Sequence, residues 1–310
     1  MAQPIKLYTV TGFLGAGKTS FLKNVLERTG DTKVGVIQNE FGKIGIDGDI
    51  IRKDGMEMIE INRGSIFCSC LQLSFIEALK EMSDKDVEYL FVEGSGLADP
   101  SNMNEILDAL HSIKPDAMDY RGAICVVDGA HFLEQLEEIE TVEKQVRHAQ
   151  LAIINKTDLI DETSKEKIHV VLKDLKKDIV IEEAQFGDFD WDFMKEDLLS
   201  MSPIHFDESY NIKENKPKTL NLTTDESVKK EDLQQFLDVI GKDCYRVKGF
   251  LKLDDGWNQV DLVGRRVDFK KIDPREETSR VVFISKIGPQ IIKPIFAAWE
   301  EHVGSKMKLR

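Results

Sequence analysis

A glycine-rich stretch near the start of the chain has the composition of a phosphate-binding loop. Residues 12–19 read Gly-Phe-Leu-Gly-Ala-Gly-Lys-Thr, which fits the pattern G-x-x-x-x-G-K-[ST]. The glycines would let main-chain N–H groups surround a phosphate, and Lys18 would bridge the β- and γ-phosphates. Thr19 would offer its hydroxyl to Mg²⁺. The candidate phosphate-binding residues are Gly12, Gly15, Ala16, Gly17, Lys18, Thr19 and Ser20.

A second motif, Asn-Lys-Thr-Asp at residues 155–158, predicts which base is bound. The carboxylate of Asp158 can accept hydrogen bonds from both N1–H and the 2-amino group of guanine, which adenine does not offer. Asn155, Lys156 and Asp158 are therefore candidate guanine-binding residues, and GTP or GDP is the expected ligand. An ATP-dependent kinase of the P-loop type is the weaker alternative.

The elements that must position these motifs are short apolar runs that alternate with amphipathic stretches. Continuous apolar runs are typical of strands buried on both faces of a parallel sheet, with helices between them. Strands are predicted at residues 5–10, 33–38, 56–61, 88–92, 121–127, 151–154 and 178–182. Helices are predicted at residues 18–28, 71–82, 102–111 and 165–177. The predicted fold class is α/β, a P-loop NTPase with a mainly parallel sheet flanked by helices.

The alternation of apolar runs and amphipathic stretches stops at residues 201–218, and this predicts a second domain. Residues 201–218 contain Pro203, Pro217 and several charges, and we interpret them as a linker, with a long surface loop as the alternative. Residues 1–200 would then form the P-loop GTPase domain and residues 219–310 a small C-terminal α+β domain. Its predicted elements are strands at 219–224, 245–253, 259–263, 267–270 and 280–285, a helix at 229–240 and a helix after Pro289.

Composition restricts the class of protein and its partners. The 42 Lys and Arg residues against 56 Asp and Glu residues give a net charge of −14, which disfavours nucleic acid and anionic membranes as partners. The sequence contains no apolar run long enough to predict a membrane span, and its N-terminus lacks the pattern of a signal peptide. Four cysteines do not make a secreted disulfide scaffold. We therefore expect a cytoplasmic protein.

Several further motifs, in a specific order, resemble a known family. The matching stretches are TGFLGAGKT at 11–19, NEFG at 39–42, EGSGLADP at 93–100, VD at 127–128, NKTDL at 155–159, RVKGF at 246–250 and RVVFI at 280–284. The whole set resembles the CobW-like family of metal-handling P-loop GTPases, which are related to the hydrogenase and urease nickel chaperones.

The resemblance implies a Mg²⁺-dependent GTP hydrolase that acts as a metallochaperone or metal-insertion switch. Its partner would be a client metalloprotein or a cofactor-assembly enzyme, and a nucleotide-dependent homodimer is compatible with the family. Glu93 would hold Mg²⁺ directly or through water, and Gly96 would sense the γ-phosphate through its N–H. Residues 39–47 would form the first switch, where Glu40 and Asp47 would contact Mg²⁺ or position the attacking water. An ordinary Asp-Gly turn is the alternative for Asp47.

The thiolate motif of the family, Gly-Cys-x-Cys-Cys, is altered in this chain. Ser65 and Phe67 stand where the family has cysteines, Cys68 matches, and Cys70 is an additional thiol. One interpretation is a transition-metal site for Zn²⁺, Co²⁺ or Ni²⁺, built from Cys68, Cys70 and Glu40 and completed by a partner or dimer mate. The others are a redox-sensitive dithiol and two buried thiols without a metal. The last favours an alternative function, a metal-free, nucleotide-gated chaperone for a metal- or corrinoid-dependent enzyme.

Other titratable residues are expected to be structural. Cys125 lies in an apolar run and should be part of the core, and Cys244 has no cysteine or histidine at ligand spacing. The six histidines do not pair at metal-ligand spacing. The glutamates between residues 134 and 143 predict a solvated helical face.

Overall fold

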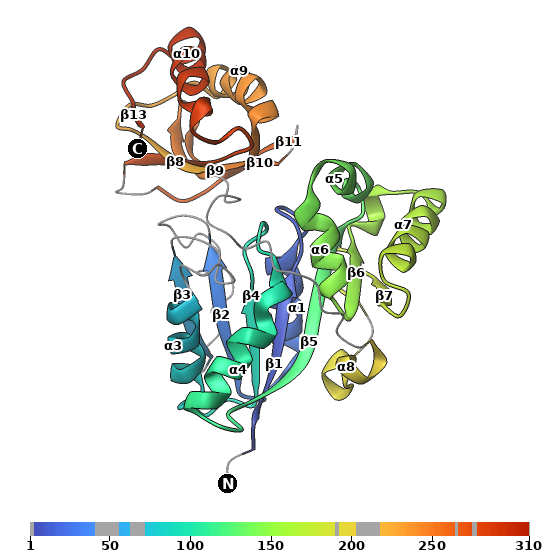
Figure 1. Ribbon diagram of the computed structural model, residues 1–310. Coiled ribbons are helices and arrows are strands. Elements are labelled where there is room, and N and C mark those ends of the chain that lie inside the picture. The colour runs from blue at the N-terminus through green and yellow to red at the C-terminus, as the bar shows by residue number, and fades with distance from the viewer. Residues whose placement is uncertain are drawn as a thin grey trace. The chain divides into compact units, whose positions relative to one another are not determined.

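The computed structural model describes residues 3–40, 56–62, 72–189, 192–202, 218–263, 266–274 and 278–309. The chain divides into two compact units, residues Met1–Asn215 and Lys216–Arg310. The linker predicted at 201–218 falls largely on residues outside those described, so the limits 1–200, 201–218 and 219–310 stay predictions. Figure 1 labels the helices and strands of both units.

The first unit is built on a seven-stranded sheet in the order β3-β2-β4-β1-β5-β6-β7. Every neighbouring pair is parallel, so all seven carboxyl ends lie along one edge. The strands are β1 Ile5–Thr11, β2 Val34–Glu40, β3 Glu57–Asn62, β4 Tyr89–Glu93, β5 Met118–Asp128, β6 Leu151–Asn155 and β7 Val180–Glu183. The predicted parallel sheet is confirmed.

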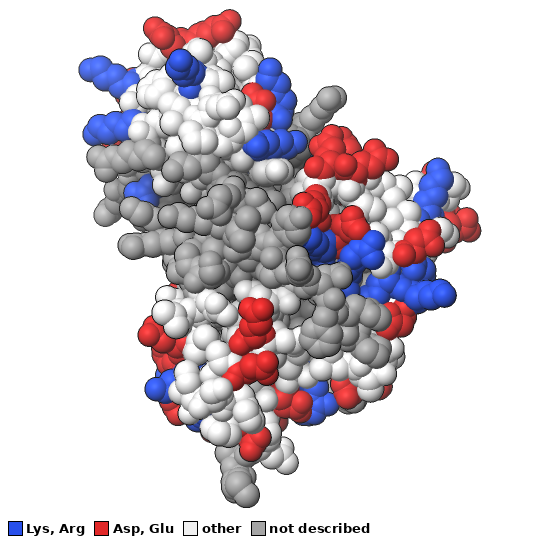
Figure 2. All heavy atoms as spheres, viewed as in Figure 1, with Lys and Arg blue, Asp and Glu red and all other residues white. Residues whose placement is uncertain are grey.

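Helices cover both faces of this sheet (Figure 1). They are α1 Lys18–Arg28, α3 Gln72–Met82, α4 Met103–Ile113, α5 Phe132–Glu138, α6 Glu140–His148, α7 Glu162–Leu175 and α8 Leu198–Met201. Short 3₁₀ turns lie at η1 Pro100–Asn102, η2 Thr157–Leu159 and η3 Phe193–Lys195. The stretch expected to be a solvated helical face forms two helices, because Ile139 between them is extended and buried. In Figure 2, Asp and Glu side chains gather over α5.

The two faces of the sheet carry separate apolar cores. Tyr8 and Phe91 lie in the core that includes α1, whereas Leu7 and Leu90 lie in the core that includes α3 and α4. Successive strand residues point to opposite faces. This is why the sequence shows continuous apolar runs rather than alternation.

The second unit is a six-stranded antiparallel sheet in the order β11-β10-β9-β12-β8-β13. Helices α9 and α10 pack on it, with Phe236, Phe283 and Trp299 in one core. The elements are β8 Lys218–Thr224, α9 Lys230–Ile240, η5 Gly241–Asp243, β9 Cys244–Leu253, β10 Gly256–Val263, β11 Arg266–Lys271, β12 Ser279–Ser285, η6 Gly288–Ile291, α10 Ile292–His302 and β13 Lys308–Leu309. The predicted small α+β unit is confirmed, and the two-residue β13 was too short to be predicted.

None of the helices in the described parts of the chain has the length and apolar character needed to cross a membrane.

Candidate functional site

The glycine-rich loop connects β1 to α1, as its sequence predicted. Gly17 has a φ of 101°, and a Cβ built there would lie 2.2 Å from Nδ2 of Asn155. Only glycine fits this position, because a side chain would be strained and would overlap the asparagine. The loop and the residues 155–158 motif are therefore in close contact, although they are far apart in the sequence.

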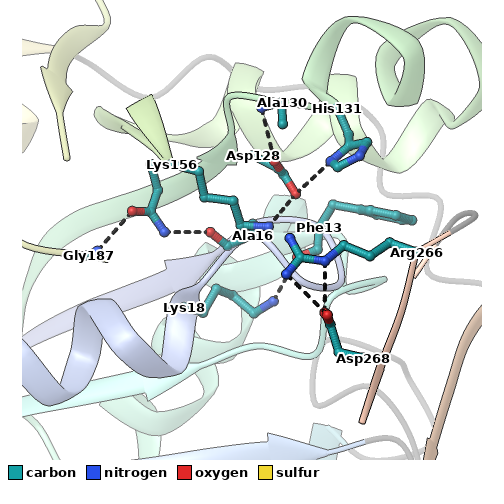
Figure 3. A network of polar contacts seen from close by, with 11 residues as sticks. Phe13, Ala16, Lys18, Asp128, Ala130, His131, Lys156, Gly187, Arg266 and Asp268 are labelled. Atoms are coloured by element: carbon teal, nitrogen blue, oxygen red, sulfur yellow. Dashed lines mark hydrogen bonds and ion pairs between the residues drawn. The ribbon is translucent and has the colours of Figure 1, made fainter. Parts of the chain in front are cut away.

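Lys18 begins α1 and its ammonium group lies against the loop. Its Nζ donates hydrogen bonds to the carbonyl oxygens of Gly12 at 2.8 Å and Phe13 at 3.1 Å. Figure 3 shows Lys18 beside Phe13, and the side chain of Lys18 is buried. The N-terminus of α1 adds partial positive charge at the same place. Together they concentrate positive charge at a helix N-terminus, an arrangement of the kind that binds an anion.

A carboxylate on the neighbouring strand lies beside the loop. Glu93 ends β4 and is buried; its Oε1 accepts a hydrogen bond from Thr19 Oγ1 at 3.2 Å. Its Oε2 accepts one from Gln38 Nε2 at 3.0 Å, on β2. The structure thus brings together Thr19 and Glu93, the two residues predicted to hold Mg²⁺. A hydroxyl and a carboxylate are oxygen donors, which Mg²⁺ prefers.

The segment after Glu93 lies against the loop as well. A Cβ built on Gly96 would lie 2.6 Å from the main-chain nitrogen of Leu14. On the other side, Gln145 of α6 donates hydrogen bonds from Nε2 to the carbonyl oxygens of Gly96 at 3.2 Å and Ala98 at 3.0 Å. The predicted sensor of the γ-phosphate is therefore packed between the loop and α6.

Asn155 ties three segments together at the end of β6. Its Nδ2 donates a hydrogen bond to the carbonyl oxygen of Ala16 at 2.9 Å, and its Oδ1 accepts one from the N–H of Gly187 at 2.8 Å (Figure 3). The side chain is buried. The phosphate loop, the residues 155–158 motif and the loop after β7 are therefore held in a fixed relation.

Lys156 is held by a buried carboxylate on the adjacent strand. Its Nζ lies 2.7 Å from Oδ2 of Asp128, which also lies 3.3 Å from Nδ1 of His131. The other oxygen of Asp128 accepts a hydrogen bond from the N–H of Ala130 at 3.1 Å (Figure 3). Lys156 has a φ of 63°, so the chain turns sharply before Asp158, which is exposed. An exposed carboxylate at this edge is accessible to a ligand.

Several predicted site residues lie outside the described part of the structure. They are Asp47, Cys68 and Cys70, together with the side chain of Glu40 at the end of β2. Their assignments stay predictions, as does that of Ser20, which is exposed in the first turn of α1. Within the described residues, no group of three or more His, Cys, Asp or Glu side chains could hold a metal ion.

The two described cysteines are buried thiols. Burial raises the pKa of Cys125 to about 12 and, with Asp243 nearby, that of Cys244 to about 12. Both therefore stay protonated near neutral pH, whereas a metal ligand must be a thiolate. This agrees with the expectation that Cys125 belongs to the core.

Sequence reading did not single out Gln38 or Gln145, both of which contact the site. It placed Asp128 in a family motif but did not predict its contact with Lys156. Gln38 and Asp128 are polar residues at the ends of apolar strands, and this is a signal that sequence reading could have used. Gln145 lies on an amphipathic helix among charged residues, where nothing in the pattern marks it.

Family models match both units of the chain. Residues 6–182 match the CobW/HypB/UreG nucleotide-binding domain, which is more than half of the chain. The chain belongs to the CobW/HypB/UreG family. Residues 218–298 match the C-terminal domain of the cobalamin synthesis protein cobW. The CobW-like resemblance predicted from the motifs is confirmed.

Curated relatives of this CobW-family chain align over about half of their length. One is the zinc chaperone YjiA of Escherichia coli, 29% identical over 192 residues, which are 60% of this chain and 59% of the relative. Another is the zinc chaperone CobW of Sinorhizobium, 30% identical over 182 residues, which are 49% of this chain and 51% of the relative. A crystal structure of Zn(II)-bound YjiA GTPase from E. coli aligns with 97% of this chain and 99% of its own at 22% identity and a TM-score of 0.47.

Proposed function

We propose that this protein is a Mg²⁺-dependent GTPase that acts as a metallochaperone, delivering a transition metal to a client metalloprotein. The observation that carries the GTPase part is the hydrogen bond of 3.2 Å between Thr19 and Glu93, beside the buried Lys18. A phosphate-binding cation and a pair of oxygen ligands at one sheet edge are what phosphoryl transfer from a nucleotide requires. The relatives named as zinc chaperones support the delivery part.

In this proposal each residue of the loop has a defined task. Lys18 exchanges its carbonyl partners in the loop for β- and γ-phosphate oxygens, and the loop amides surround the β-phosphate. Thr19 and Glu93 would hold Mg²⁺, which, when bound, neutralises charge on the phosphate oxygens. Gly96 donates its N–H to the γ-phosphate, and Asp158 accepts from the guanine base. The sequence assigns neither a catalytic glutamine nor an arginine finger, so we expect slow intrinsic turnover.

The cargo metal would be bound by Cys68, Cys70 and Glu40. Two thiolates and one carboxylate leave a four-coordinate ion such as Zn²⁺ one position short. That position can be taken by a ligand from the client or from a second copy of the chain, which suits transfer better than storage. Ser65 and Phe67 reduce the thiolate number, and they favour the alternative of a nucleotide-gated chaperone that carries no metal.

Zn²⁺ titration of the metal-free protein separates these two functions. It should be carried out with GDP and with a non-hydrolysable GTP analogue, on the unchanged chain and on Cys68→Ala. Binding that depends on Cys68 supports delivery of a metal. Cys125→Ala is the matched control, because this buried, protonated thiol should not contribute. Absence of binding in both nucleotide states would reject the metallochaperone and leave the metal-free switch. Equal turnover of ATP and GTP would reject the assignment of guanine.

A further inference from the structure

Helix α6 contacts the segment that follows Glu93 through a buried amide. Gln145 is 1% exposed, and its Nε2 donates to two carbonyl oxygens, those of Gly96 and Ala98, at 3.2 and 3.0 Å. Because both partners are acceptors, the NH₂ group must face the segment. Residues 94–99 are neither helix nor strand. The carbonyl of Ser95 accepts from the main-chain N–H of Ala98 at 2.9 Å, whereas the carbonyls of Gly96 and Ala98 are bonded by the side chain of Gln145.

The same segment also lies against the phosphate loop. A Cβ at Gly96 would lie 2.5 Å from Cδ2 and 2.6 Å from the main-chain nitrogen of Leu14. The main chain at Gly96 is thus held between Leu14 and Gln145. A second residue of α6, Lys144, has its Nζ 4.0 Å from Oδ2 of the buried Asp99.

The chemistry of the site indicates that glutamine does more here than fill space. Among the described residues, Oε1 of Gln145 is buried and has no hydrogen-bond partner. A buried acceptor without a partner is unfavourable, so an apolar side chain of the same length would suit a purely structural position better. The amide donors are the feature that an apolar residue cannot supply.

We propose that Gln145 is a positioning residue for the γ-phosphate: it holds residues 96–98 so that the N–H of Gly96 stays beside the phosphate loop. It thereby sets the preference of the protein for the triphosphate over the diphosphate, and it couples the γ-phosphate to α6. This inference rests on the proposed GTPase function, since it gives the N–H of Gly96 a γ-phosphate to contact.

The variant Gln145→Met keeps the length of the side chain and removes both donors. The affinity of the full chain with Mg²⁺ is measured by calorimetry for GDP and for a non-hydrolysable GTP analogue. Two hydrogen bonds are lost, so we expect the analogue to bind about tenfold more weakly while GDP affinity changes less than about twofold. In turnover, KM for GTP should rise by a similar factor, because KM equals Kd when turnover is slow, and kcat should fall in addition.

Gln150→Met is the matched control. Gln150 is also fully buried, and its Oε1 accepts a hydrogen bond from the N–H of Ala123 at 2.7 Å, just before β6 begins. Its loss should change the binding of both nucleotides equally. If Gln145→Met leaves the ratio of the two affinities unchanged, or Gln150→Met changes it as much, the positioning role is wrong.

Two further outcomes are distinguishable. If Gln145→Met does not fold, Lys144→Ala is measured instead. This variant must weaken the binding of the GTP analogue more than the binding of GDP; otherwise the inference is rejected. If the unchanged protein binds neither guanine nucleotide, the proposed GTPase function itself is wrong and the role of Gln145 falls with it. If the unchanged protein binds both guanine nucleotides and Gln145→Met does not alter the ratio of their affinities, only the positioning role of Gln145 is rejected.

Discussion

The side proposed to bind guanine and the side proposed to bind phosphate lie on the same edge of one sheet, but different contacts hold them. On the guanine side, the amide of Asn155 is bonded to main-chain atoms of Ala16 and Gly187, and Lys156 is paired with the buried Asp128. On the phosphate side, Glu93 is bonded to the side chains of Gln38 and Thr19. The contacts of Asn155 hold main-chain segments in place, whereas the side-chain contacts of Glu93 can be exchanged for a metal ion or water without moving a strand.

This difference would suit the two tasks of the proposed nucleotide switch. The guanine base is the same in GTP and GDP, so its site gains from rigidity. The γ-phosphate is present in one state and absent in the other, so the contacts near it must be exchangeable. Removing residues on each side should therefore have different consequences.

The largest effect is expected on the phosphate side, from Lys18→Ala. It removes the buried ammonium that would neutralise phosphate charge, and hydrolysis should fall by roughly 100-fold or more. Single-turnover hydrolysis of GTP measures this. Lys23→Ala on the same helix is the control, because Lys23 is exposed and its contact with Glu27 spans 3.9 Å. Hydrolysis at an unchanged rate in Lys18→Ala would contradict the assignment of the glycine-rich loop to the catalytic site.

Asp158→Asn tests the guanine side. The amide can no longer accept two hydrogen bonds from guanine, but it can donate to the 2-carbonyl of xanthine. GTP affinity should fall by roughly 10- to 100-fold and xanthosine triphosphate should become the better ligand. Competition binding with the two nucleotides measures the change. Asp161→Asn is the matched control, because Asp161 caps α7 through the N–H of Ser164 and asparagine caps equally well. Unchanged preference for GTP would contradict the assignment.

Asn155→Ala tests the rigidity of the guanine side. It removes hydrogen bonds at 2.9 and 2.8 Å and leaves the carbonyl of Ala16 and the N–H of Gly187 without these partners. We expect about tenfold weaker binding of GDP and of a GTP analogue alike, and a loss of about 1 to 2 kcal/mol in the free energy of unfolding. Asn24→Ala is the control, since Asn24 bonds the same loop, at Phe186, from an exposed position. Weaker binding of the triphosphate alone would show that the two sides are not distinct.

The sequence predicted the parallel sheet and the loop because both follow from short-range patterns. Continuous apolar runs and the glycine spacing are properties of neighbouring residues. The contacts of Asn155 with Ala16 and Gly187 join segments far apart in the chain, and no local pattern encodes such pairs. For the same reason the sequence could not indicate that Gln145 contacts Gly96. The break at Ile139 was also missed, because its extended conformation depends on the core that buries it.

The variant expected to affect nucleotide binding least changes the stability of the protein instead. Lys176, after α7, is 3% exposed, and its Nζ donates a hydrogen bond to the carbonyl oxygen of Ala149, just before β6. Burial lowers the pKa of this lysine from 10.5 to about 8. Below pH 8 the ammonium is charged in both the folded and the unfolded chain. Between pH 8 and 10.5 the unfolded chain holds the proton more tightly, so the free energy of unfolding should rise with pH in this range.

Lys176→Met should remove that rise. Relative to the variant, the free energy of unfolding of the unchanged protein should rise by about 2 to 3 kcal/mol between pH 7 and pH 10. Urea unfolding at each pH measures this. Lys177→Met is the matched control, because Lys177 is exposed and should leave the pH profile as it is. GDP and GTP affinities at pH 7 should be unchanged in both variants, since Lys176 lies near the start of β6 and the guanine contacts lie at its end. Parallel pH profiles of stability for the unchanged protein and Lys176→Met would contradict the lowered pKa of Lys176. A selective loss of affinity for GDP or GTP would mean that the two ends of this strand are coupled.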